Sequence, residues 1–354
     1  MIKKVRQQQL LIFILSIFYI LLLSFFLLYK VHVYNTMTFY LFDFITPLFI
    51  YILTPVMILF LTYVHFKKNN NNTASYQYIT NIIDKINIPD IDRQNGEKNY
   101  HKYILGQTLV KYISICLVVT VGYFYIYFSD IYYIFEDSFY TILLIIVFII
   151  ILLAILIFNI KQYQKYYINI IDTYPYQFIY SSYLLLTQHR GSINECQMIY
   201  KMNISAALSH IAEYQYAYDF LKSIWNERYK KVNKETLLII NYNSYYFNMR
   251  LHNYGQADIY KKETLNIFNS LSKKQVNQKN ISMIPDNIQI EELYQNKQWN
   301  DIIEYINNHN LDMNKEYYHA MLYISYHHLN DDKANDIYDL HKDHIIFKKL
   351  IEQE

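Results

Sequence analysis

The chain of 354 residues has few glycines and prolines, 5 of each, and only two cysteines. It contains no glycine-rich phosphate-binding loop. Cys116 lies in an apolar run and Cys196 in the polar half, which argues against a disulfide framework and for a reducing compartment. The formal net charge of +2 is small and evenly spread, so the basic patch of a nucleic-acid-binding protein is also missing.

Catalytic and metal-binding patterns are absent as well. The sequence has no His-Glu-x-x-His motif, no paired carboxylates in its apolar runs, and no Ser/Lys or Ser/His arrangement there. Five histidines and several aspartates gather between His319 and His344, but their spacing matches no metal motif and is equally typical of a charged helix surface. We therefore expect a protein that is not an enzyme and that holds no metal or other cofactor.

Aromatic residues are abundant, with 41 Tyr and 21 Phe. Together with many Ile, Asn and Lys residues, they are what an AT-rich bacterial coding sequence yields. The number of tyrosines is therefore not treated as a functional signal.

The long apolar runs all fall before residue 161 and predict four transmembrane helices. These are residues 10–28, about 39–64, about 109–128 and 139–160. The first run follows the basic stretch MIKKVR but is longer than a signal-peptide core and has no cleavage site after it, so we expect it to be retained.

Basic residues set the orientation of the four predicted spans. They precede the first span, fill the loop at about 67–108 and follow the last span, while the two opposite connections hold only Lys30. The sequence predicts a multi-pass protein of the cell membrane with both termini in the cytoplasm.

Polar and helix-kinking residues within the predicted spans allow two interpretations. Asp43 and Lys111 lie near span ends, where they reach the headgroups, and Pro47 and Pro55 are ordinary in membrane helices. Alternatively, Asp43, Pro47 and Pro55 shape a site in a transporter component or a small-molecule or peptide receptor. We expect the first interpretation.

After residue 161 the apolar residues recur at helical spacing, with turn residues about every dozen positions, which predicts antiparallel helix pairs. One aromatic and one small residue mark the second helix of several pairs. Tyr214 precedes Ala217 by three residues, and Leu221 follows one turn later. The same device recurs as Tyr254 with Ala257 and, in weaker form, as Trp299 with Ile302. Ala334 is followed four residues later by Tyr338, as Ala217 is by Leu221. A small side chain allows two helices to approach closely.

This pattern resembles the tetratricopeptide repeat family over residues 197–342. The chain departs from that family because its repeat intervals are irregular, the expected glycines are absent and Ile302 replaces a small residue. A generic helical bundle that uses alanine for close packing is the alternative.

The resemblance implies a curved stack whose first helices line a groove for a segment of another protein. Carried over by position, the groove residues would be Tyr242, Tyr246, Met249, Arg250, His319, Tyr323, Tyr326 and His327. Such aromatic, Met and Arg side chains are enriched at protein interfaces.

Together these observations predict an all-α protein of two domains. Residues 1–160 form a four-span membrane domain in contact with the lipid bilayer, and residues 161–354 form a cytoplasmic α-hairpin stack. The expected function is scaffolding, recruitment or sensing through a protein or peptide partner in the cytoplasm. A transporter or receptor role of the spans and an immunity-type membrane protein are the alternatives.

Overall fold

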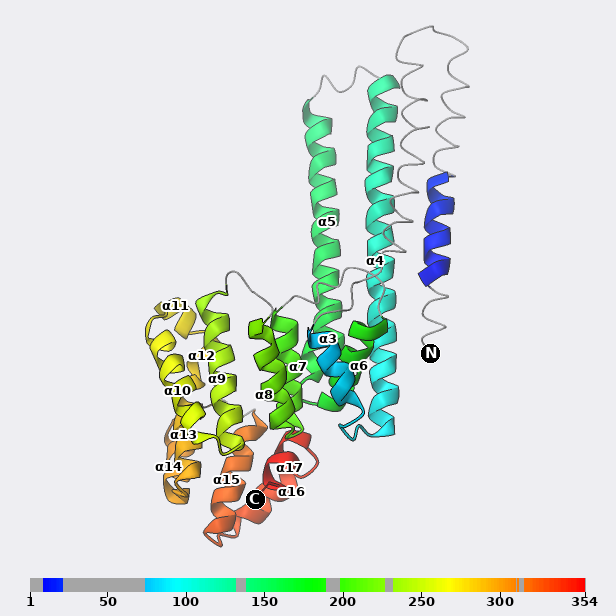
Figure 1. The fold of residues 1–354 in the computed structure, drawn as a ribbon. Helices are drawn as coiled ribbons and strands as arrows, with labels where there is room; N and C mark the ends of the chain where they lie inside the picture. Colours follow the sequence, from blue (N-terminus) through cyan, green and yellow to red (C-terminus); the bar gives the residue numbers. More distant parts are fainter. Residues whose placement is uncertain are drawn as a thin grey trace. The chain divides into compact units, whose positions relative to one another are not determined.

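The computed structural model describes residues 9–21, 74–131, 138–188, 198–226, 232–309, 311 and 315–353. All regular secondary structure in these ranges is helical, which confirms the all-α prediction (Figure 1).

Two compact units divide the chain, and each is made of several segments. The first consists of Met1–Asn70, Glu97–Tyr167 and Gln188–Ile193, and the second of Asn71–Gly96, Ile168–Thr187 and Asn194–Glu354. The predicted loop at about 67–108 thus contributes Asn71–Gly96 to the second unit, which holds the helical hairpins.

The first unit contains the helix Gln9–Leu21, most of α4 (Asp90–Ile131) and α5 (Ser138–Tyr166). Gln9 donates a hydrogen bond from Nε2 to Thr108 Oγ1 at 3.0 Å, and the hydroxyls of Tyr19 and Thr120 lie 2.8 Å apart. These two contacts join the helix Gln9–Leu21 to α4.

Within the described residues, one helical segment is long and apolar enough to cross a membrane, Ile149–Ile170. It overlaps the fourth predicted span. The first predicted span is described only to Leu21, the third lies within α4, and the second, with Asp43, Pro47 and Pro55, falls outside the described residues. The described part therefore supports one span and does not support four.

The second unit contains α3 (Ala74–Ile83), η2 (Ile168–Ile170), α6 (Pro175–Gln188) and a series of helices that follow them. The series consists of α7 (Met198–His210), α8 (Tyr214–Asn226), α9 (Lys234–Arg250), α10 (Tyr254–Asn269), α11 (Lys273–Val276), α12 (Lys279–Ser282), α13 (Ile284–Gln295), α14 (Trp299–Asn308), α15 (Glu316–His328), α16 (Lys333–His341) and α17 (Ile345–Ile351).

Among the described residues, four antiparallel hairpins share one turn geometry. The pairs are α7–α8, α9–α10, α13–α14 and α15–α16, and each turn holds one residue in the left-handed region, namely Ala212, His252, Lys297 and Asn330. In each turn the following backbone N–H donates to the carbonyl five residues earlier, as from Glu213 to Leu208 at 3.0 Å. This is the Schellman closure of a helix, here built with no glycine.

Small or apolar residues lie at the contact between the helices of each pair. Ala217, Ala257 and Ile302 are each the fifth residue after the left-handed position, and all three are fully buried. Ser205 of α7 donates from its hydroxyl to the carbonyl oxygen of Ala217 at 2.7 Å. A larger side chain at position 217 would hold α7 and α8 apart.

The fourth hairpin differs slightly in phase. Its alanine, Ala334, is the fourth residue after Asn330, and its backbone N–H donates to Asp331 O three residues back. Ala334 is buried all the same.

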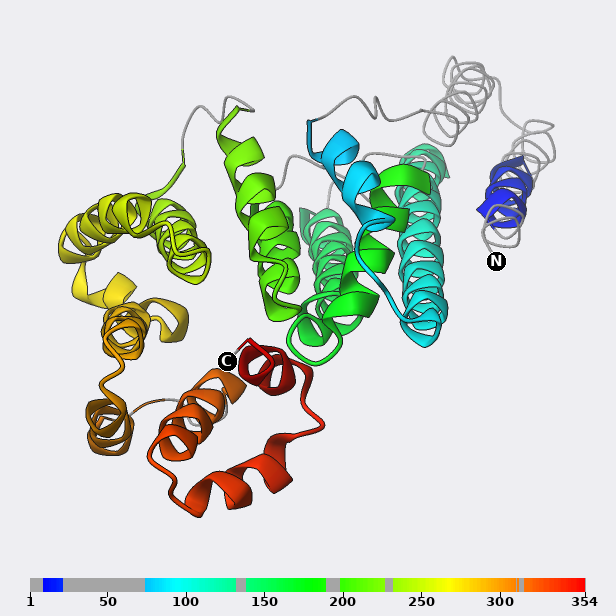
Figure 2. The same ribbon diagram turned by 60° about the horizontal axis from the view of Figure 1, so that its bottom comes forward.

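The hairpins of the second unit form a closed arc, in which the end of the series packs against its beginning. The series α8 to α9, α9 to α13, α13 to α14 and α14 to α15 is connected by packing at every step, and α17 packs against both α15 and α7 (Figure 2). The last helix of the chain therefore contacts the first helix of the first hairpin.

Helix α3 packs against α8 at the start of the arc. The rings of Tyr78 and Phe220 have centroids 5.7 Å apart, and Ile79, Ile82 and Ile83 are buried. The apolar face of this segment is thus covered by protein within the second unit.

Candidate binding site

The inner side of the arc is filled by side chains of its own helices. Tyr246 of α9 contacts Tyr214 of α8 and Tyr317 of α15, with ring centroids 5.8 and 6.4 Å apart. Helices from three hairpins therefore meet at one aromatic residue.

A buried ion pair lies at the centre of this cluster. Arg250 donates from Nη2 to Glu291 Oε1 at 2.6 Å, and the two side chains are 4% and 0% exposed. The hydroxyl of Tyr317 donates to the same Glu291 oxygen at 2.8 Å. Arg250 Nε and Glu291 Oε2 are buried and have no hydrogen-bond partner within the described ranges.

The environment of this pair sets its protonation. Burial by itself lowers the pKa of Arg250, but the negative charge of Glu291, together with Tyr246, Tyr214 and Tyr317, outweighs it and holds that pKa well above its usual range. Burial raises the pKa of Tyr246 and of Tyr317, so both hydroxyls stay protonated. The guanidinium also lies over the rings of Tyr246 and Tyr294, at 5.4 and 4.7 Å from their centroids.

A second polar link joins the same three helices through Asn287 of α13. Its Nδ2 donates to the hydroxyl of Tyr242 at 3.0 Å, and its Oδ1 accepts from the hydroxyl of Tyr318 at 2.8 Å. One amide thereby satisfies a tyrosine from α9 and another from α15.

The groove residues expected on α9 are therefore placed in two environments. Tyr242, Tyr246 and Arg250 belong to the inner cluster, where they hold α9, α13 and α15 together. Met249 is largely buried between α9 and α13, and it borders a pocket that opens on the other side of the same helices.

The groove residues expected on α15 contact the last helices. Tyr323 packs against Phe347 of α17, with ring centroids 5.6 Å apart, and His319 stacks on His341 at 3.9 Å. Tyr326 lies beneath the ammonium of Lys333 at 5.3 Å, and His327 is exposed.

The aromatic residues of the expected packing device also differ in their surroundings. Tyr214 is buried with Ala217 and Leu221, whereas Tyr254 and Tyr338 are exposed. Trp299 stacks on His328 with centroids 4.3 Å apart and contacts Tyr294 at 5.9 Å.

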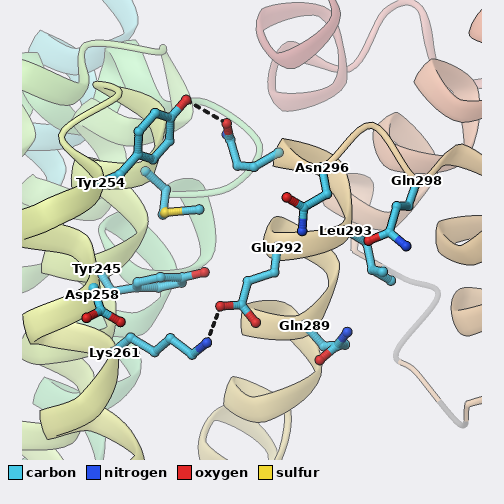
Figure 3. Close-up of a pocket in the computed structure, with 11 residues that line it drawn as sticks. Tyr245, Tyr254, Asp258, Lys261, Gln289, Glu292, Leu293, Asn296 and Gln298 are labelled. Atoms are coloured by element: carbon cyan, nitrogen blue, oxygen red, sulfur yellow. Dashed lines mark hydrogen bonds and ion pairs between the residues drawn. The ribbon is translucent and has the colours of Figure 1, made fainter.

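A pocket of about 420 Å³ lies between the α9–α10 hairpin and α13 (Figure 3). Tyr245 and Met249 come from α9, and Tyr254, Asp258 and Lys261 from α10. The opposite wall and the turn beyond it contribute Gln289, Glu292, Leu293, Gln295, Asn296 and Gln298.

Two polar contacts bridge the walls of this pocket, and Figure 3 shows both. Lys261 forms an ion pair with Glu292, with side chains 27% and 33% exposed. The hydroxyl of Tyr254 donates to Gln295 Oε1 at 2.9 Å. The pocket thus offers opposite charges, several side-chain amides and an apolar floor of Tyr245, Met249 and Leu293.

Sequence reasoning missed Glu291 and the pocket residues of α13. A signal for Glu291 was available, because it follows Ile284 and Ile288 at the spacing of one helix face. A carboxylate on an apolar face has to find a buried cationic partner. The pocket gives no comparable signal, since its polar residues look like ordinary surface positions.

In the described part of the chain, no group of three or more His, Cys, Asp or Glu residues is placed to hold a metal ion. Compared with family models, with curated proteins and with solved structures, the chain matches none of them.

Proposed function

We propose that this chain is a non-enzymatic, multi-pass membrane protein that uses its helical-hairpin unit to dock a protein or peptide partner on the cytoplasmic side. The observation that carries the proposal is the series of four hairpins with one turn geometry. Stacked helical hairpins form extended surfaces that suit recognition of another chain.

Exposed apolar side chains support the membrane part of the proposal. On α5, Ile150, Leu153 and Ile157 are 58%, 53% and 50% exposed, in a segment long enough to span the hydrocarbon layer. Leu11 and Phe18 of the helix Gln9–Leu21 are exposed in the same way. Lipid would cover these side chains, and we retain four spans with cytoplasmic termini as part of the proposal.

A likeness to tetratricopeptide repeats is also retained as a proposal. It is supported by the fixed interval from each left-handed turn residue to Ala217, Ala257 and Ile302. The phase change at Ala334 remains a departure from a regular repeat.

The pocket between α10 and α13 is the docking point we propose. Its volume of about 420 Å³ lies near the lower end of the range for ligand pockets, which begins at about 300 Å³. A pocket of this size suits one or two side chains of a peptide. Side-chain amides such as those of Gln289 and Asn296 both donate and accept hydrogen bonds, as a peptide backbone requires. The partner segment we expect is extended and polar, with an apolar side chain on Tyr245 and Met249.

The experiment is site-specific photo-crosslinking of the full chain in its own membranes. A photo-reactive amino acid replaces the exposed Asn296 at the pocket, and a matched control replaces the exposed Glu304 on α14. A discrete adduct at position 296 is expected, absent at position 304, and reduced when Gln289→Trp fills the pocket. No adduct at position 296, or one unaffected by Gln289→Trp, would overturn this docking point.

A transporter or receptor role of the spans is the alternative. The residues on which it depends, Asp43, Pro47 and Pro55, lie outside the described residues. An Asp43→Asn, Pro47→Ala variant that loses function while it keeps the crosslink at position 296 would favour this alternative.

A further inference from the structure

The contact that closes the arc is surrounded by ionisable side chains. His210 of α7 has its Nε2 3.1 Å from Asp172 Oδ1, and His341 of α16 has its Nδ1 2.9 Å from Glu316 Oε2. His344 is the N-cap of α17, which packs against both α15 and α7, and the charges of both pairs act on it.

The three histidines differ in their positions on the helices and in their hydrogen-bond partners. His210 and His341 stand in the last turns of α7 and α16, where the helix dipole favours a cation, and each has a carboxylate partner. His344 is the N-cap of α17, at the end of the dipole that disfavours a cation. Its Nδ1 is buried and has no hydrogen-bond partner among the residues that the structure describes.

The packing of α17 depends on its apolar residues Ile346, Phe347, Leu350 and Ile351. Phe347 and Leu350 are buried with Ala320, against Tyr317 and Tyr323 of α15. Tyr317 is also the residue whose hydroxyl donates to Glu291 in the inner cluster. Helix α17 has only seven residues, and short elements with a small buried area open at a lower free energy than longer packed hairpins.

We propose that α17 is an acid-released latch, in which protonation of His344 frees the last helix from α7 and opens the closed arc of hairpins. The latch follows from the position of His344 at the α17 N-cap and from its unpartnered, buried Nδ1. It does not depend on the docking proposal.

The direction of the pH effect follows from the surrounding charges. Burial lowers the pKa of His344; the acids Glu316 and Asp172 oppose the shift, and His210 and His341 add to it. Because the unfolded chain binds this proton more readily, the docked state of α17 is stable at neutral pH and loses stability below about pH 6.5.

Other ionisable groups at the junction titrate in different ranges or in the opposite sense. The hydrogen bond from His210 and the charges of His210, Lys315 and His344 lower the pKa of Asp172. The stability that ionised Asp172 contributes is therefore lost only in stronger acid. Burial raises the pKa of Glu213, and the charge of Lys349 of α17 opposes that rise. The hydrogen bond to Glu352 raises the pKa of Lys349, and burial raises that of Tyr176, so neither titrates in mild acid.

Hydrogen–deuterium exchange of the full chain, corrected for intrinsic rates, tests the latch. Between about pH 7.5 and about pH 5.5 we expect the protection of residues 345–351 to fall about fivefold, while that of α9 holds. His344→Gln should abolish the fall, and His210→Gln should retain it. Glu316→Gln removes a charge that favours protonation, so it should move the midpoint to lower pH.

Three results would overturn the latch. The first is equal protection of α17 at both pH values in the unmodified chain. The second is a fall in protection that persists in His344→Gln. The third combines two observations. Helix α17 is unprotected from exchange at both pH values in the His344→Gln variant, and the pH midpoint of the loss of protection is unchanged in the Glu316→Gln variant.

Discussion

Glu291 and Glu292 are neighbours on α13, and each forms an ion pair with the α9–α10 hairpin, yet their surroundings are opposite. Glu291 is fully buried with Arg250 inside the arc, whereas Glu292 is one third exposed with Lys261 at the pocket. A buried charge needs its ion-pair partner because the protein interior cannot solvate it. When an exposed charge loses its partner, water solvates it at little cost in stability. We infer that the inner side of α13 holds the fold together and that its outer side is free to recognise a partner.

The largest effect is expected from breaking the inner pair. Glu291→Leu leaves the guanidinium of Arg250 buried without its partner, and Arg250→Met does the same to the carboxylate of Glu291. Each substitution should therefore lower the free energy of unfolding by about 3–5 kcal/mol. The double variant leaves no buried charge and should recover most of that loss. Thermal unfolding of the full chain in detergent gives the comparison; equal losses in single and double variants would show that the charges are not coupled.

A smaller effect is expected from the hairpin contact. Ala217→Leu forces a large side chain against the carbonyl that accepts from Ser205, so stability should fall by about 1–3 kcal/mol. Ala206→Leu, at a half-buried position of the same hairpin, is the control and should cost less. Similar losses in both variants would contradict the close contact at Ala217.

The smallest effect is expected at the turns and has the opposite sign. Lys297 has φ of 56°, a conformation that costs a residue with a side chain roughly 1 kcal/mol and glycine almost nothing. Lys297→Gly should raise the unfolding free energy by up to about 1 kcal/mol, whereas Lys297→Ala should not. A destabilised Lys297→Gly would argue against the shared turn.

Helix type and hairpin contacts could be read from the sequence because they depend on local patterns. The interval from Tyr214 to Ala217 and from Tyr254 to Ala257 marks the start of a second helix, and the structure places such a start at both. Which side of a helix faces the interior was harder to read. Tyr242 and Tyr246 share a helix face in the sequence, but only packing from α13 and α15 shows that this face is covered.

The pocket and the closing contact depend on residues far apart in the chain. Lys261 and Glu292 are ordinary charges on separate helices until the hairpins stack. Likewise, no pattern around His210 indicates that α17, more than a hundred residues later, packs against its helix. Long-range placement of this kind has no local signature for a single sequence to reveal.

The comparison of the two glutamates also gives the most direct test of the account. Glu291→Gln and Glu292→Gln, made in the full chain with the crosslinker at position 296, would be measured for thermal stability and adduct yield in the same membranes. We predict that Glu291→Gln lowers the melting temperature by several degrees, and that Glu292→Gln keeps it within about a degree while it reduces the adduct. An equally large loss of stability in Glu292→Gln, or an unchanged melting temperature in Glu291→Gln, would contradict the division of α13 into a structural inner side and a recognising outer side.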